Sequence, residues 1–307
     1  MQENRESAPE STNFLQEIYK ARWQTYRSEL KRCQNEATEE AVHDLRVATR
    51  RLLALIELLR ASLPHPRLQK LRTALKDQLK ALNDLRDTQV MLIAVSNILA
   101  DLPEIAPFQK YLLKRERRLL RSTARAIKSF KYSGLKKQME SVRKKILKRK
   151  PENGLERLML QTADDQFGAV MLRYQRVDPA NPASIHRTRV AFKKFRYVVE
   201  ILQPLIPGLP EGYFKKMHAF QDVMGDIQDV EVLLSTFEDF AKGKTSYEPE
   251  PVLRHYQGRH KESVNAFIED MQRLKTFWRP APEEPFPWET GELSPKENQS
   301  PGAQASF

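Results

Sequence analysis

Two stretches decide the fold, AVHDLRVATRR at residues 41–51 and SIHRTRVAFKK at residues 184–194. The second begins 143 residues after the first and keeps a histidine, an arginine three residues on, Val-Ala directly after it, and two adjacent cations. A residue pattern that recurs at long range indicates a duplicated structural unit. Since the cations return at helical spacing, each copy predicts a helix with one cationic face.

A second pair of segments supports the duplication. LNDLRDTQV at residues 82–90 aligns with MGDIQDVEV at residues 224–232, at an offset of 142. Each segment lies one expected helix after its histidine stretch. The chain is therefore predicted to be all-α and built from two four-helix bundles.

Apolar periodicity and turn residues place the individual elements. Thr38, Glu39 and Glu40 are typical of a helix cap followed by an acidic first turn, and residues 132–134 are a possible break in a long helix. The expected helices cover residues 13–34, 39–63, 67–100, 108–129 and on towards 150, 155–176, 182–203, 211–241 and 251–277. The expected domains are a disordered segment 1–12, a first bundle 13–150, a second bundle 151–278 and a disordered, proline-rich tail 279–307.

The composition indicates a helical protein with an anionic partner. Charged residues make up 30% of the chain, only 10 residues are glycine, and the net charge is +12 with a pI near 9.6. Residues 110–150 alone contain 17 Lys or Arg against Glu116 and Glu140. Such a balance favours nucleic acid, an anionic membrane surface or a phosphate polymer as partner.

Cysteine content and hydropathy point to the cytoplasm. Cys33 is the only cysteine, so no internal disulfide forms and a reducing compartment is expected. Residues 1–12 are acidic and polar, unlike a secretory signal. No run of 18 apolar residues occurs, so no membrane span is predicted.

The cationic faces have the chemistry of a phosphate site. On a helical wheel His43, Arg46 and Arg50 share one face, and Arg51 lies at its edge. The second face gathers His186, Arg189, Lys193, Arg196 and Tyr197, with Lys194 at its edge. Arginine donates two parallel hydrogen bonds to phosphate oxygens, and a histidine gains charge as the pH falls. The faces predict a polyanion site that binds more tightly at lower pH.

The duplicated His–Arg helices, each followed by a segment of the Arg-Asp-x-x-Val type, resemble the CHAD family (conserved histidine α-helical domain). RDTQV at residues 86–90 fits that type, whereas QDVEV at residues 228–232 lacks its arginine. The resemblance covers residues 13–278. It implies two four-helix bundles related by a pseudo-twofold axis, with inorganic polyphosphate bound in a basic groove or channel between them.

Carried over by position, the resemblance and the two faces give one set of expected polyphosphate-binding residues. They are His43, Arg46, Arg50, Arg51, Lys76, Lys80, Arg86, Arg117, Arg118, His186, Arg189, Lys193, Lys194, Arg196, Tyr197 and Arg259. The leading hypothesis is a non-enzymatic polyphosphate-binding protein, with a place on polyphosphate or other storage granules compatible with the family.

Other functions stay open on the residues alone. Nucleic acid is the alternative ligand, although Tyr197 is the main aromatic available near the faces for base stacking. Histidine phosphotransfer is the enzymatic alternative, since HDLR at residues 43–46 resembles a phosphorylated histidine box. No cofactor is expected, and the neighbouring arginines oppose a metal at His43 and His186. The sequence predicts no oligomeric state.

Overall fold

The computed structural model describes residues 7–36, 38–130, 132–148, 154–242, 244 and 247–290. Over these residues the protein is all-α, with nine α-helices, three short 3₁₀ helices and no β-strand. The α-helices are α1 (Ser7–Asn35), α2 (Glu39–Ser62), α3 (Pro66–Ile98), α4 (Ala106–Ser129), α5 (Tyr132–Leu147), α6 (Leu155–Tyr174), α7 (Pro182–Leu202), α8 (Tyr213–Ala241) and α9 (Glu250–Asp270). The 3₁₀ helices are η1 (Pro103–Ile105), η2 (Gln203–Leu205) and η3 (Met271–Phe277).

Local sequence explains where the two central helices of the first half begin. The Thr38 hydroxyl accepts a hydrogen bond from the Ala41 amide, which confirms the predicted cap of α2. His65 caps α3 in the same way, accepting from the Arg67 amide, and Pro66 occupies the first turn. His65 therefore has a structural role that its proline-flanked position did not reveal.

The break between α4 and α5 lies slightly earlier than expected. Phe130 leaves the helix with an extended backbone (φ −61°, ψ 123°), and Tyr132 already begins α5. Residues 132–134 therefore start a helix rather than end one. The first half of the chain has five α-helices, one more than a four-helix plan provides.

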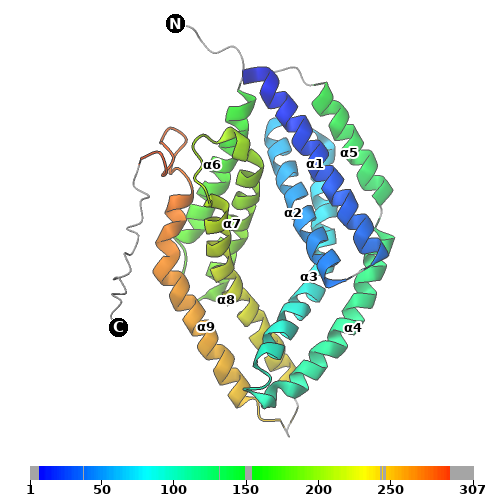
Figure 1. The fold of residues 1–307 in the computed structure, drawn as a ribbon, viewed down its shortest axis with the longest axis vertical. Coiled ribbons are helices and arrows are strands. Elements are labelled where there is room, and N and C mark those ends of the chain that lie inside the picture. The colour runs from blue at the N-terminus through cyan, green and yellow to red at the C-terminus, as the bar shows by residue number, and fades with distance from the viewer. Residues whose placement is uncertain are drawn as a thin grey trace, which may run out of the picture.

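The helices form two groups that share one apolar core (Figure 1). Helices α1 to α5 pack against one another on one side, and α6 to α9 on the other. The groups meet where α2 packs on α6 and α7. One continuous cluster of buried side chains runs through both groups, and a smaller cluster joins the ends of α3 and α4 to those of α8 and α9. Among the described residues no helix combines the length and apolarity that a bilayer span requires.

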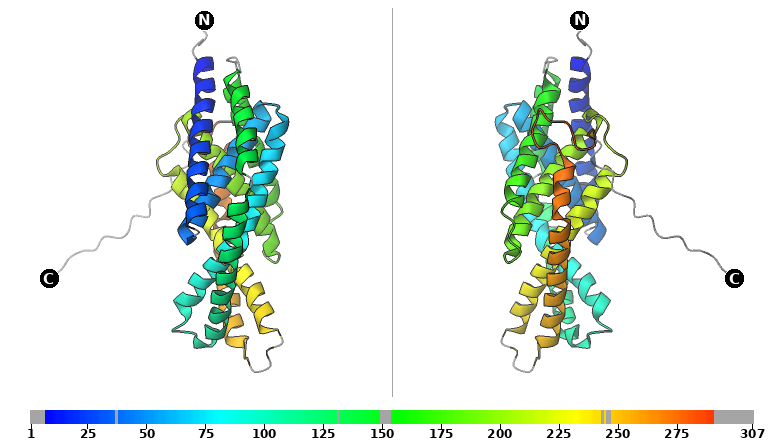
Figure 2. Two further views of the ribbon diagram at one scale, coloured as in Figure 1. Left: turned by 90° about the vertical axis from the view of Figure 1, so that its right-hand side faces the viewer. Right: turned by 90° about the vertical axis from the view of Figure 1, so that its left-hand side faces the viewer.

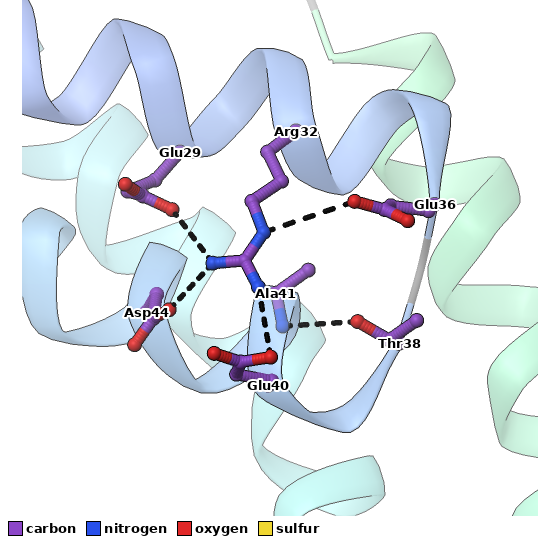
Figure 3. Close-up of polar contacts among 7 residues, drawn as sticks. All are labelled: Glu29, Arg32, Glu36, Thr38, Glu40, Ala41 and Asp44. Carbon is purple, nitrogen blue, oxygen red and sulfur yellow. Dashed lines mark hydrogen bonds and ion pairs between the residues drawn. The ribbon is translucent and has the colours of Figure 1, made fainter.

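An arginine clamps the junction of α1 and α2 (Figure 3). The guanidinium of Arg32 lies 2.8 Å from an Asp44 oxygen and 2.9 Å from a Glu40 oxygen, both on α2. Oxygens of Glu29 and Glu36 lie 3.7 and 3.8 Å away. One cation thus holds four carboxylates together where the chain turns back.

Both ends of the described part of the chain differ from expectation. Helix α1 begins at Ser7, so residues 7–12 are helical, and residues 1–6 lie outside the described residues. At the other end, residues 279–290 pack on the second group of helices: Arg279 donates to both oxygens of Asp164 at 2.9 and 2.7 Å. Phe286 is buried and stacks on Trp288. The prediction of a disordered tail is wrong for 279–290, because aromatic rings among the prolines find an apolar surface. Residues 291–307 lie outside the described residues.

Candidate functional site

Both histidine stretches line one cavity of about 670 Å³. The first stretch lies on α2 and the second on α7, which pack directly against each other. Helices α3 and α8 supply most of the remaining wall, and Gln166 of α6 completes it. Segments far apart in the sequence are therefore brought together around a single space.

Most of the predicted binding residues lie in this wall. Those that line the cavity are His43, Arg46, Arg50, Lys76, Arg86, His186, Arg189, Lys193, Lys194 and Tyr197. The polar residues of the wall outnumber its apolar ones, which include Leu53, Val90 and Val190. A small apolar molecule would leave these cations unpaired, whereas a polyanion would pair with them.

Arg46 is the most buried cation of the first stretch, at 6% exposed. Its Nη1 donates to Oδ1 of Asn83 on α3 at 2.7 Å, which fixes the guanidinium. Burial, and then the charge of Arg50, lower the pKa of Arg46 to about 10. The guanidinium remains charged at neutral pH, but the shift shows that its charge is poorly compensated in the free protein.

Arg189 of α7 is held differently. Its Nε is buried without a hydrogen-bond partner among the described residues. Its guanidinium lies over Gly225 of α8, where an added Cβ would stand 3.4 Å from Nη2. The absence of a side chain at Gly225 leaves room for Arg189 to adjust when a ligand arrives.

Lys193 has the most unusual environment. Burial, followed by the charges of Arg50, Arg189 and Arg46, lowers its pKa to about 6. The amine is therefore mostly uncharged at neutral pH in the free protein. A bound anion would stabilise the protonated form and restore the charge.

The two motif histidines also have lowered pKa values. For His43 the causes are burial and then Arg86, and for His186 they are burial and then Arg189. The Nδ1 atom of His186 is buried without a partner in the described part of the chain. Both imidazoles are thus neutral at pH 7 and have hydrogen-bonding capacity left for a ligand.

Acids share the wall with the cations. Burial raises the pKa of both Asp87 and Asp229. The nearby Asp84 carboxylate raises the pKa of Asp87 further, and Asp87 and Asp226 raise that of Asp229. Asp222, Asp226 and Glu57 also line the cavity. Although Asp87 and Asp229 lie in the same wall, in the described residues no carboxylate oxygen lies within 4.0 Å of Arg46, Arg189 or Lys193. The cations are balanced at a distance and remain free to contact a ligand.

Two predicted binding residues lie outside the cavity wall and approach one acid, Glu200. Arg196 is only 2% exposed, donates through Nε to Gln221 at 3.0 Å, and forms an ion pair with Glu200. Arg51 approaches the same Glu200 carboxylate at 3.6 Å from the other side of the α2–α7 contact. Because Glu200 already neutralises Arg196, that guanidinium is removed from the ligand-binding set.

The remaining predicted residues lie elsewhere on the surface. Arg117 and Arg118 are exposed on α4, Arg259 is exposed on α9, and Lys80 is exposed on α3. None of these four lines the cavity. Residues that the sequence did not single out take their place, chiefly Asn83, Gly225 and Gln166. Asn83 and Gly225 occupy matching places in the two aligned segments, and this correspondence was the one available signal.

The chain and its fold are similar to those of known proteins. The sequence model of the CHAD domain matches residues 15–238, most of the chain. No curated protein sequence matches this chain. Among solved structures, the CHAD domain from the plant Ricinus communis superposes with a TM-score of 0.68 at 18% identity, covering 85% of this chain and 91% of that one.

PptA from Streptomyces chartreusis superposes with a TM-score of 0.58 at 15% identity, covering 86% of this chain and 98% of that one. At such identities the structural matches show a shared fold. Together with the match over residues 15–238, they confirm the resemblance drawn from the duplicated stretches: the chain belongs to the CHAD family.

Proposed function

We propose that this protein is a non-enzymatic binder of inorganic polyphosphate, which it holds in the cavity between α2, α3, α7 and α8. The observation that carries the proposal is the convergence of both histidine stretches on one space. A linear polyanion that enters this space contacts Arg46 and Arg50 from one half and Arg189 and Lys193 from the other. The second set of contacts is then effectively intramolecular, which raises affinity.

The cavity suits phosphate better than a nucleobase. Tyr197, the aromatic ring of its wall, is 6% exposed and is covered by the Arg196 guanidinium at 4.4 Å. That ring is not free to stack on a base, and stacking is a main source of affinity for single-stranded nucleic acid. The arginine guanidiniums, including the unpartnered Nε of Arg189, donate hydrogen bonds that phosphate oxygens accept.

The proposal includes an internal duplication. In it, α2 and α3 correspond to α7 and α8, so that Arg46 matches Arg189 and Asp87 matches Asp229. A pseudo-twofold axis through the α2–α7 contact would relate the two halves, with α5 as an addition in the first. Action in the cytoplasm, on polyphosphate or at storage granules, belongs to the same proposal and rests on family resemblance.

The test replaces one arginine from each half. We expect R46Q/R189Q to lower the affinity for long-chain polyphosphate by about a hundredfold, because each buried charge-assisted contact contributes about 1.5–3 kcal/mol. The matched control is R157Q/R173Q, which removes two exposed arginines of α6 outside the cavity. Isothermal titration calorimetry at two salt concentrations measures both effects.

Two results would contradict the proposal. Equal losses in the double variant and its control would show that diffuse charge, rather than the cavity, binds the polymer. Single-stranded RNA that displaces polyphosphate more effectively than the reverse would assign the cavity to nucleic acid. Wild-type binding should weaken steeply with salt, since counterions are released when phosphates are neutralised.

A further inference from the structure

Helix α4 carries a row of cations that the cavity does not use. The α4 stripe, as we name it, consists of Lys110, Lys114, Arg117, Arg118, Arg121, Arg125 and Lys128. All of these side chains are exposed, and none lines the cavity. The stripe accounts for Arg117 and Arg118, which the sequence had assigned to the central site.

The stripe is narrow and straight. At 3.6 residues per turn its members fall within an arc of about 100°, and its ends are about 27 Å apart along the helix axis. The opposite face of α4 is the buried one, formed by Phe108, Leu112 and Ile127 among others. The cations therefore project directly away from the bundle.

No acid compensates the stripe. Within the part of the chain that the structure describes, no carboxylate oxygen lies within 4.0 Å of any of its members. Glu116, the one acid of α4, lies about 150° around the helix from the centre of the stripe. Like charges at i, i+4 such as Arg117 and Arg121 repel by a few tenths of a kcal/mol per pair. A helix shaped for solubility alone would relieve this with interspersed acids.

Helix α3 lies between the cavity and the helix that carries the stripe. Helix α3, which contributes Lys76, Asn83 and Arg86 to the cavity, also packs against α4. Helices α4 and α5 follow each other along one edge of the molecule in Figure 1, and this edge faces the viewer in Figure 2, left. Exposed cations of α5, among them Lys136 and Lys144, extend the positive charge in that direction.

We infer that the α4 stripe is a second polyphosphate contact, reached only by chains long enough to leave the cavity and cross to the outer face of α4. This inference rests on the proposed function. It predicts that long polymers bind more tightly than short ones, and it assigns this difference to α4. A polymer held at both places binds with the avidity of two linked sites.

The chemistry of the stripe argues for a flexible polyanion without bases. Its neighbour Tyr111 is 37% exposed, but its ring already packs with Phe108 and Phe240, and Gln109 bonds to Ser96. The stripe therefore has no row of aromatic rings on which successive bases could stack. Most apolar side chains of α4 are buried or partly buried, and Tyr111 and Leu113 are its two exposed large apolar residues, too few to form a face that enters a membrane. What remains is a line of point charges, which suits a linear polymer of phosphates.

The experiment compares a short and a long ligand on one variant. We expect R117E/R121E/R125E to bind tripolyphosphate within about twofold of wild type and long-chain polyphosphate about ten- to a hundredfold more weakly. The control, R157E/R173E/R176E, makes the same change of charge at exposed arginines away from α4. Circular dichroism confirms folding, and the corresponding triple glutamine variant replaces any variant that does not fold.

The outcomes separate this inference from the proposed function. One outcome is that R46Q/R189Q loses affinity for both tripolyphosphate and long-chain polyphosphate, while the stripe variant and its control bind the long chain equally well. This outcome would overturn the inference and leave the cavity proposal standing. If the wild-type protein bound neither tripolyphosphate nor long-chain polyphosphate, the cavity proposal and the stripe inference would both be overturned. A stripe variant that loses binding to duplex DNA or to phosphatidylglycerol vesicles, and keeps long-chain polyphosphate, would assign the stripe to that other partner.

Discussion

Residues at matching places in the two histidine stretches have different supports. Arg46 is fixed by the amide of Asn83 at 2.7 Å, whereas Arg189 lies over Gly225 with its Nε unpartnered. The first arginine is thus preorganised and the second adaptable. A site with one rigid and one adjustable guanidinium can accept a polymer whose phosphates do not repeat in register with the protein.

The Asn83 amide offers a test with opposite effects on stability and binding. In N83D a carboxylate would face the buried Arg46 guanidinium, so we expect the free energy of unfolding to stay equal or rise. The same charge repels phosphate, and the affinity for polyphosphate should fall by at least about tenfold. Urea unfolding and calorimetry measure the two quantities. The control is N265D, at an exposed residue of α9. An equal loss of affinity in N265D would count against the assignment of Arg46.

Lys193 makes binding depend on pH. Its pKa of about 6 in the folded protein lies below the ~10.4 of an exposed lysine, so the unfolded chain holds more protons between these values. Folding stability should therefore rise as the pH increases from about 6 to about 10. Bound phosphate favours the protonated amine, so binding takes up a proton and affinity should fall as the pH rises above about 6.

The variant K193Q separates this effect from general charge. We expect it to lose affinity strongly near pH 6 and little near pH 9, and to take up fewer protons on binding. Calorimetry in buffers with different ionisation enthalpies counts those protons. K261Q on α9 should keep the wild-type pH profile, and an unchanged profile in K193Q would refute the role of this amine.

At the residue scale, the sequence predicted most of the cations of the site. It placed Arg196 on the cationic face that binds the ligand, whereas the structure buries this residue. A helical wheel shows which residues share a face of a helix, but it does not show which part of that face a neighbouring helix covers. Helix α8 brings Gln221 and His218 over Arg196, and Glu200 neutralises it. Asn83 and Gly225 were missed because an amide and a glycine have no charge to draw attention.

Among the elements, helices were predictable where apolar periodicity was long and a cap was present. Helix α2 begins at its predicted Thr38 cap, and α7 begins at Pro182 as expected. The possible break before α5 was expected at residues 132–134, and it lies earlier because Phe130 ends α4 with an extended backbone. The packing of α5 against α1 and α3 then decides that it belongs to the first group.

The junction of α1 and α2 depends on one cation among four acids. In R32A the carboxylates of Glu29, Glu36, Glu40 and Asp44 would remain close together without a counter-charge. We therefore expect a lower melting temperature at pH 7 and a smaller loss at pH 4, where carboxylates begin to be protonated. R27A, an exposed α1 arginine outside these contacts, is the control for thermal unfolding. Equal losses at both pH values would exclude charge repulsion as the cause.

For the whole molecule, the segment after η3 closes the second group of helices. Asp164 of α6 accepts both guanidinium bonds of Arg279 and the indole bond of the buried Trp278. The sequence predicted disorder here from its prolines and glutamates. Its three aromatic rings, Trp278, Phe286 and Trp288, outweigh that composition because together they bury a large apolar area.

Removal of Asp164 tests this closure. We expect D164A to lower the free energy of unfolding by about 3–5 kcal/mol, since it leaves a partly buried guanidinium and an indole N–H unpaired. Polyphosphate affinity below the melting transition should be unchanged, because Asp164 does not line the cavity. The neighbouring exposed Asp165 provides the control D165A, and similar unfolding curves for the two variants would contradict the closure.

The sequence by itself determined that the chain is helical, that it carries two matching histidine–arginine faces, and that its family is CHAD. The helices and the two faces follow from periodicity and residue spacing, which are local, and the family follows from the resemblance of these stretches and the match over residues 15–238. Only the tertiary structure decided that the faces of α2 and α7 meet at one cavity, that Arg196 is withdrawn into the core, and that the α4 cations form a separate outer stripe. Each of these features depends on which face of one helix is covered by another helix. Such packing joins segments far apart in the chain, so no single stretch of sequence encodes it.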